Sequence, residues 1–61
     1  MIRNLYRIEA PHFVAGVETE LRNGRERVVR AAPIIGWSIG MTALELVSLA
    51  IRKGWKVEGQ E

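Results

Sequence analysis

Apolar residues recur at helical spacing most clearly between residues 42 and 54. Thr42 is followed three residues later by Glu45. This is the spacing of a capping box, in which the side chain of each residue accepts a hydrogen bond from the backbone N–H of the other. Gly54 follows two basic residues, which is typical of a helix end because glycine adopts the left-handed conformation without strain. We therefore predict one main helix between Thr42 and Gly54.

Apolar side chains cover most of the circumference of this helix at about 100° per residue. The apolar residues are Ala43, Leu44, Leu46, Val47, Leu49, Ala50 and Ile51. A helix that lies on one sheet needs an apolar stripe of only about 100°, so the wider arc predicts contacts on two sides, with a second copy of the chain supplying one of them. The candidate oligomer-interface residues are Trp37, Leu46, Leu49 and Ala50.

Period-two alternation dominates the first third of the chain. Residues 4–9 place Tyr6 and Ile8 on one side and charged residues on the other, which predicts a short strand. Pro11 should end it, because proline cannot donate to a strand ladder. From residue 12 to 21, the odd positions are largely apolar and the even ones become polar toward the end, which predicts a second strand with one buried face.

Asn23-Gly24 is the strongest hairpin signal in the sequence, because both residues tolerate positive φ. A two-residue loop would place Val17 opposite Arg30, whereas a three-residue loop with Gly24 in the left-handed conformation would place Val17 opposite Val29. We favour the three-residue loop because it keeps the apolar residues of both strands on one face.

The remaining segments complete an α+β plan. Pro33 and Gly40 bound one or two helical turns, and Trp55 and Val57 alternate with charged residues in a short closing strand. We predict a single small domain over residues 1–61 with the order β-β-β-α-α-β. It combines a three- to four-stranded antiparallel sheet with one main helix and a short helical turn before it.

The chain has 61 residues, 48% of them hydrophobic, with no cysteine and one histidine. Chains this small usually depend on disulfides, a metal or oligomerisation for stability. Disulfides are excluded, and a structural zinc site needs more ligands than one histidine supplies. We therefore expect a homo-oligomer without a metal or cofactor.

The net charge is +2, and glutamates are interleaved with the arginines. Dedicated nucleic-acid-binding proteins usually gather their basic residues on one face, so this composition by itself is a weak signal for nucleic acid. No targeting segment or long apolar run is present. We expect a cytoplasmic protein that does not bind membranes.

His12 is the residue that titrates near neutrality and would suit a general base or a phosphate contact. No nucleophile pattern, carboxylate pair or metal-ligand cluster accompanies it in the sequence, and a catalytic site needs several groups in mutual geometry. We therefore predict that the protein is not an enzyme. Trp55 should pack on the last helical turn, while Trp37 fits either the core or a subunit contact.

Arginines gather on or beside the predicted hairpin, namely Arg22, Arg25, Arg27 and Arg30. Guanidinium groups match phosphate geometry, so a basic β-ribbon would suit nucleic acid. Alternatively, the charges only keep the hairpin soluble, with Glu18 and Glu20 neutralising arginines across the strands. Tyr6 and Phe13 would add an aromatic surface if they share the face of the arginines. The candidate ligand-binding residues are Tyr6, Arg7, His12, Arg27 and Arg30.

Three runs, YRIEAPHFVAGV at residues 6–17, VVRAAPII at 28–35 and RKGWKV at 52–57, resemble a class of very small proteins encoded by tailed bacteriophages and prophages. The resemblance attaches no activity and no functional residue to the chain, but it implies a context. Small phage proteins without an enzymatic motif are often inhibitors of host machinery, including proteins that block CRISPR effectors or sequester nucleotide signals of host immunity.

These observations lead to three hypotheses. We expect a non-enzymatic phage-type counter-defence or host-takeover protein in the host cytoplasm. It would be a small homo-oligomer that blocks a host immune effector protein or sequesters an anionic nucleotide in a pocket shared between subunits. The alternative is a nucleic-acid-binding regulatory or accessory protein that uses the basic hairpin and loses affinity steeply with salt. The third is a structural or assembly factor.

Overall fold

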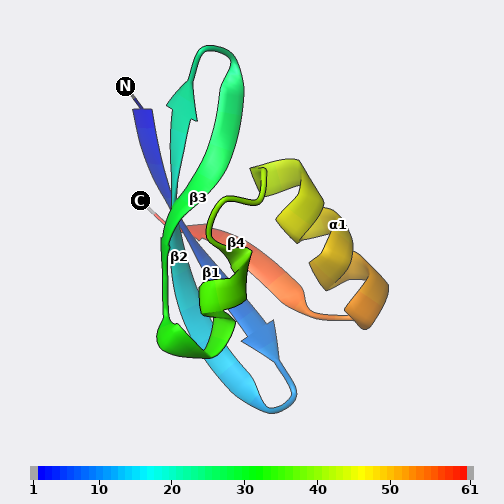
Figure 1. Ribbon diagram of the computed structural model, residues 1–61. Helices are drawn as coiled ribbons and strands as arrows, with labels where there is room; N and C mark the ends of the chain where they lie inside the picture. The colour runs from blue at the N-terminus through cyan, green and yellow to red at the C-terminus, as the bar shows by residue number, and fades with distance from the viewer. Residues whose placement is uncertain (1, 61) are drawn as a thin grey trace.

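A computed structural model describes residues 2–60 as a four-stranded antiparallel sheet with two helical segments on one of its faces (Figure 1). The elements are β1 (Ile2–Ala10), β2 (Phe13–Arg22), β3 (Arg25–Ala31), the 3-10 helix η1 (Pro33–Ser38), α1 (Ala43–Lys53) and β4 (Lys56–Gln60). The strand order is β3-β2-β1-β4. The predicted α+β fold is confirmed, with the closing strand added beside β1.

The first strand is longer than the sequence pattern indicated. β1 extends from Ile2 to Ala10 because its first residues pair with the end of β2, where Ile2 lies opposite Leu21. Pro11 and His12 form the tight turn between β1 and β2. Proline is tolerated there because the turn requires no ladder N–H from it.

The turn between β2 and β3 has two residues, so the favoured three-residue loop is wrong. Asn23 and Gly24 have φ values of 53° and 77°, and Arg22 pairs directly with Arg25. Two successive positive φ values are the signature of a type I′ turn, whose twist matches that of the flanking strands.

A β-bulge in β3 returns Ala31 to the face of Val17, but it does not give the pairing of Val17 with Val29 that the longer loop would have produced. Glu18 pairs with Arg30 and Val17 pairs with Ala31, which leaves Val29 as the extra residue of β3. In a regular strand, one added residue moves every later side chain to the opposite face. The bulge absorbs that shift, so that Ala31 packs on the core and Arg30 lies on the other side of the sheet.

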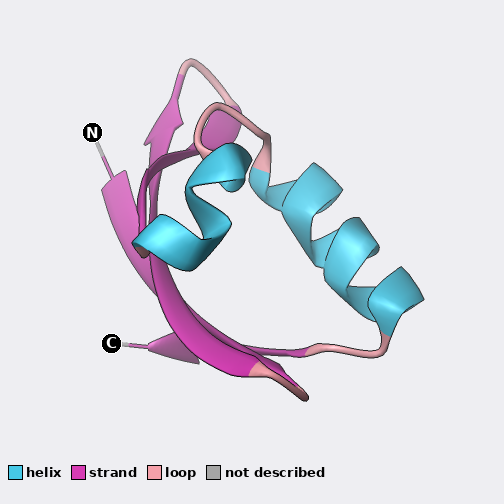
Figure 2. Ribbon diagram, turned by 60° about the horizontal axis from the view of Figure 1, so that its bottom comes forward, coloured by secondary structure: helices cyan, strands magenta, loops and turns pink. Residues whose placement is uncertain are grey.

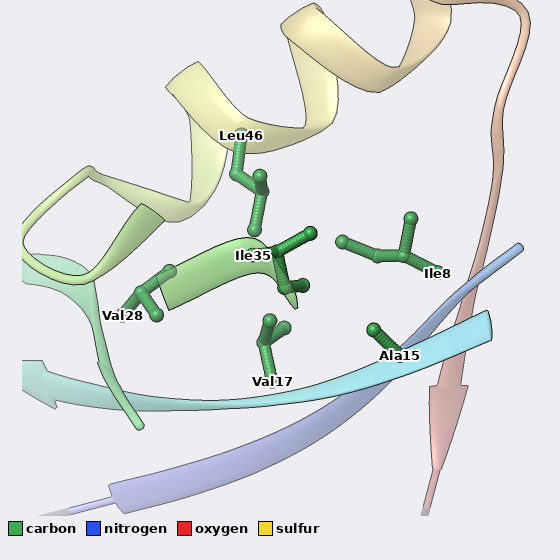
Figure 3. Packing of buried hydrophobic residues seen from close by; sticks show 6 residues of the cluster. All are labelled: Ile8, Ala15, Val17, Val28, Ile35 and Leu46. Carbon is green, nitrogen blue, oxygen red and sulfur yellow. The ribbon is translucent and has the colours of Figure 1, made fainter. Parts of the chain in front are cut away.

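The core lies between the sheet and the two helical segments (Figure 2). In Figure 3, Ile35 of η1 and Leu46 of α1 approach side chains that rise from β1, β2 and β3. The buried cluster consists of Ile8, Ala15, Val17, Val28, Ile35 and Leu46. The predicted apolar face of residues 12–21 is confirmed, since its odd positions are the ones that lie toward the helices.

The predicted helix is also confirmed at both ends. The Glu45 N–H donates to Thr42 Oγ1 at 3.1 Å, and the Thr42 N–H donates to Glu45 Oε1 at 2.9 Å. At the other end Gly54 has a φ of 76°, and the Trp55 N–H donates to the Ala50 carbonyl at 2.8 Å. This bond turns Trp55 back onto the core, where it is partly buried as expected.

The segment that connects η1 to α1 covers part of the outer edge of β3. The Val28 N–H donates to the Met41 carbonyl at 2.9 Å, and the Gly40 N–H donates to the Val28 carbonyl at 2.9 Å. Gly40 has a φ of 94°, which glycine adopts readily. These bonds fix β3 in place against the connecting segment.

Candidate functional site

The sheet has one covered face, toward η1 and α1, and one open face without helices (Figure 2). Side chains alternate between faces along a strand, and Ile8, Val17 and Val28 are buried on the covered face. The register therefore places six of the seven arginines on the open face. They are Arg3, Arg7, Arg22, Arg25, Arg27 and Arg30.

Four glutamates share the open face, and they pair with residues of β1, β2 and β4. Arg3 lies 3.6 Å from both Glu18 Oε1 and Glu20 Oε2, and Arg22 Nη2 lies 3.1 Å from Glu20 Oε1. The other ion pairs are Arg7–Glu9 and Lys56–Glu58, each at 3.7 Å. The two β2 carboxylates thus turn toward β1 and along their own strand, and away from β3.

The β3 arginine row consists of Arg25, Arg27 and Arg30, and none of them makes an ion pair with another residue in the range 2–60. Arg27 Nη1 donates to the Gly40 carbonyl at 2.9 Å, which holds that side chain at the strand edge. The bulge at Val29 keeps Arg30 on the same face as the other two. Surface hollows adjoin the row: Glu20 shares one with Arg25 and Arg27, Glu18 shares another with Arg30, and a third lies between Arg25 and the start of α1.

The excess positive charge of the described chain is confined to the open face. Seven basic and four acidic side chains share that face, which gives it a net charge of +3. The remaining charged side chains within residues 2–60 are Glu26, Glu45, Arg52 and Lys53, and their charges cancel. The interleaving seen in the sequence therefore conceals a marked difference between the two sides of the molecule.

The candidate ligand-binding residues do not form one site within a chain. Arg7, Arg27 and Arg30 lie on the open face, but Tyr6 lies on the covered face. His12 lies in the turn between β1 and β2, and ten residues of β2 separate it from the other hairpin end, about 33 Å at the usual rise per residue.

The aromatic residues stay apart from the arginines. Phe13 and Trp55 pack edge to face with ring centroids 5.2 Å apart, and His12 lies 4.9 Å from Phe13. Both Phe13 and Trp55 contact the core cluster. The condition for an aromatic and basic surface, a shared face, is therefore not met.

A polar cluster on the covered face was missed by sequence reasoning. Three side chains from β1 and β2 donate to a single oxygen, Oε2 of Glu26: the Tyr6 hydroxyl at 3.0 Å, the Asn4 amide at 3.1 Å and the Thr19 hydroxyl. Thr19 is fully buried. The signal was available, because these residues are polar at positions where the alternation expects apolar ones, but the wrong hairpin register hid their proximity.

The cluster shifts the pKa values of both titratable members. The hydrogen bond from Thr19 lowers the pKa of the Glu26 carboxyl, and those from Asn4 and Tyr6 lower it further against the opposing effect of burial. Burial raises the pKa of the Tyr6 phenol, and the hydrogen bond to Glu26 raises it further. Tyr6 therefore acts as a neutral donor to an ionised carboxylate, and its hydroxyl is engaged within the chain.

The candidate interface residues also need revision. Leu46 and Ala50 are buried in the chain's own core, with 4% and 0% of their surface exposed, because they face the sheet. Leu49 is half-buried, and Trp37 on η1 is 52% exposed. The most exposed apolar side chains of α1 are instead Leu44 and Ile51, so the structure moves the candidate interface to a different side of the helix.

Comparison with protein families, curated proteins and solved structures found no match to this chain. Within residues 2–60, no three potential metal-binding side chains of the His, Cys, Asp and Glu types lie together. In the same range no helix has the length and apolar character needed to cross a membrane. The arrangement of charge on the open face is therefore the observation from which a function can be argued.

Proposed function

We propose that this protein is a non-enzymatic nucleic-acid-binding protein that contacts the phosphate backbone through its open face. The observation that carries the proposal is the β3 arginine row, whose three guanidinium groups make no ion pair within residues 2–60. Guanidinium groups bind phosphate oxygens through two parallel N–H donors. A row of guanidinium groups without internal ion-pair partners in this range is suited to an external polyanion.

The spacing of the row supports contact with phosphates of one DNA strand that lie about two nucleotides apart along the helix axis. A β-strand rises about 3.4 Å per residue, and each strand of B-DNA carries one phosphate per about 3.4 Å of helix axis. Arg25 and Arg27, two residues apart on β3, therefore differ in position by about two nucleotides. The two-residue turn leaves this end of the hairpin narrow, which favours close approach to a backbone.

A duplex is the favoured form of nucleic acid, because the part of the open face that the structure describes has no aromatic side chain on which bases would stack. Proteins that bind single strands usually combine a basic groove with aromatic side chains. Within residues 2–60 no Phe, Tyr or Trp side chain lies on the open face. Binding through phosphates alone carries little direct sequence information, so we expect weak sequence preference.

The test is fluorescence anisotropy of a labelled DNA duplex, titrated with the protein at several salt concentrations. Three phosphate contacts give a slope of log affinity against log salt of about −2.7. Replacing Arg25→Gln and Arg30→Gln together should reduce the magnitude of that slope by about 1.8. Arg27 is left in place because it hydrogen-bonds Gly40.

The matched control is Arg3→Gln with Arg7→Gln, which removes the same charge from the same face. Both of these arginines are already paired with glutamates, so their loss should reduce affinity less. Equal losses would show that the face acts only through its net charge. Absence of duplex binding at low salt, or stronger binding to a single strand, would overturn the proposal.

The resemblance to small phage proteins suggests the setting in which such binding would matter. A small protein that occupies nucleic acid without sequence preference would interfere with host proteins that act on the same substrate, which is a route to host takeover or counter-defence. Comparing duplex cleavage by a host nuclease with the wild-type protein and with the Arg25→Gln/Arg30→Gln variant would test this role.

A further inference from the structure

The helix α1 carries an exposed apolar stripe that the chain itself does not cover. Leu44 is 76% exposed and Ile51 is 69% exposed. They are seven positions apart in the sequence, so they lie only about 20° apart around the helix. Val47, which is half-buried, lies between them. We call Leu44, Val47 and Ile51 the α1 stripe.

Charge favours a second copy of the chain as the occupant of this stripe. The open face has a net charge of +3 and would repel another copy of itself. The helix α1 carries only three charged side chains, and two of these are opposite in sign and placed at its two ends, Glu45 and Arg52. The helical side is therefore the large surface on which two copies can meet without strong repulsion.

We propose that two copies associate through antiparallel α1 helices, with a two-fold axis between Val47 and Ser48. A two-fold interface uses the same patch on both subunits. With the axis at this point, Leu44 meets the partner's Ile51 and Ile51 meets the partner's Leu44. The small Ser48 at the centre, which is exposed, permits close approach of the two helices.

The antiparallel arrangement also pairs the helix charges. Glu45 and Arg52 lie on one side of α1, about 20° apart, next to the stripe. Antiparallel packing brings each Glu45 to within about 3 Å, along the helix axis, of the partner's Arg52, whereas parallel packing would separate them by about 10 Å along the axis. The cap bonds of Glu45 go to its Oε1, so Oε2 is available to the partner's Arg52.

The association is tested first by sedimentation equilibrium of the wild-type chain and of Leu44→Ser/Ile51→Ser. Because both side chains are mostly exposed, the double variant should stay folded, as circular dichroism would check. Loss of the two contacts between Leu44 and the partner's Ile51 should raise the dimer dissociation constant about 30-fold or more. A monomeric wild-type chain at high concentration, or an equally tight dimer from the variant, would overturn the proposal.

The orientation is tested by oxidative cross-linking, since the chain has no cysteine of its own. Ser48→Cys places a thiol beside the axis and should give a covalent dimer. Arg52→Cys is the matched control on the same helix: antiparallel packing separates the two thiols by about 13 Å along the axis, too far for a disulfide. Efficient cross-linking through position 52 would indicate parallel packing and contradict the proposal.

Neither the sedimentation nor the cross-linking experiment involves nucleic acid, so the proposed dimer and the proposed function can fail separately.

Discussion

The two faces of the sheet differ sharply although the same strands form both. On β1, Ile8 is fully buried while its neighbour Arg7 is exposed. The covered face is apolar except for the Glu26 cluster, and the open face carries eleven charged side chains within residues 2–60. A short chain can therefore separate stability from recognition. Substitutions on the covered face should change stability, and substitutions of adjacent residues on the open face should change binding, each with little effect on the other property.

The largest expected effect comes from moving a charge to the covered face. Ile8→Glu would bury an unpaired carboxylate in the core, which costs several kcal/mol, and a 61-residue chain has little stability to lose. We expect loss of cooperative urea unfolding. The matched control, Arg7→Glu on the open face, should unfold within about 1 kcal/mol of the wild type. Equal damage from both substitutions would contradict the two-face description.

The next effect concerns the polar exception on the covered face. Glu26→Leu leaves Tyr6, Asn4 and the buried Thr19 without their acceptor, and buried donors without partners cost about 1–3 kcal/mol each. We expect the free energy of unfolding, measured in urea at neutral pH, to fall by about 2 kcal/mol. Thr19→Val, which removes one donor and keeps its shape, should cost less. If Glu26→Leu leaves the free energy of unfolding unchanged, the cluster does not contribute to stability.

The same cluster predicts a pH dependence. Because folding lowers the pKa of Glu26, its stabilising contribution is present above the ordinary pKa of 4.5 and is lost as pH falls through the folded-state value. The raised pKa of Tyr6 acts at the other end: its contribution is present below 10.0 and is lost as pH rises further. Urea unfolding across this range, compared with Glu26→Gln, should show a smaller acid loss in the variant. If the free energy of unfolding falls equally at acid pH in the wild type and in Glu26→Gln, Glu26 does not cause the acid loss of stability.

A smaller effect is expected from removing the bulge. Deleting Val29 leaves Val28, Arg30 and Ala31 in regular alternation, with each still on its present face. We therefore expect a folded chain whose free energy of unfolding changes by about 1 kcal/mol or less, and whose duplex affinity is largely retained. If the deletion abolishes folding, the bulge supplies a twist that the sheet needs and does more than correct the register.

The smallest effect is expected from a single surface ion pair. Arg3 contacts Glu18 and Glu20 at 3.6 Å and its side chain is 55% exposed, so solvent screens both pairs. Arg3→Gln should change the free energy of unfolding by about 1 kcal/mol or less, and the change should shrink at high salt. A larger, salt-independent loss would mean that Arg3 contributes through packing of its stem.

The features that sequence analysis predicted correctly depend on short segments. The helix ends follow from Thr42, Glu45 and Gly54, which act within one turn of their own positions. The buried face of β2 follows from alternation along one strand. The type of fold then follows because such elements have few ways to cover one another.

The errors arise where two distant segments must be aligned. The loop length was inferred from a pairing of Val17 with Val29, but the chain has a shorter loop, and a bulge at Val29 places Val17 opposite Ala31. The same error hid the contact of Glu26 with Thr19. Helical periodicity showed that α1 is apolar on two sides, yet it could not show that Leu46 faces the sheet and Leu44 faces outward.

The placement of both helical segments on one side of the sheet (Figure 2) has a consequence for valency. If two chains join through α1, each sheet becomes an outer layer and the two open faces point away from each other. The dimer would then be a bivalent linker with one nucleic-acid-binding surface on each of its two opposite sides. Such a linker gains avidity when both ends reach the same polymer, and joins two polymers when they do not. At equal site occupancy, a dimer of this kind would compact long duplex DNA, whereas a monomer would only coat it.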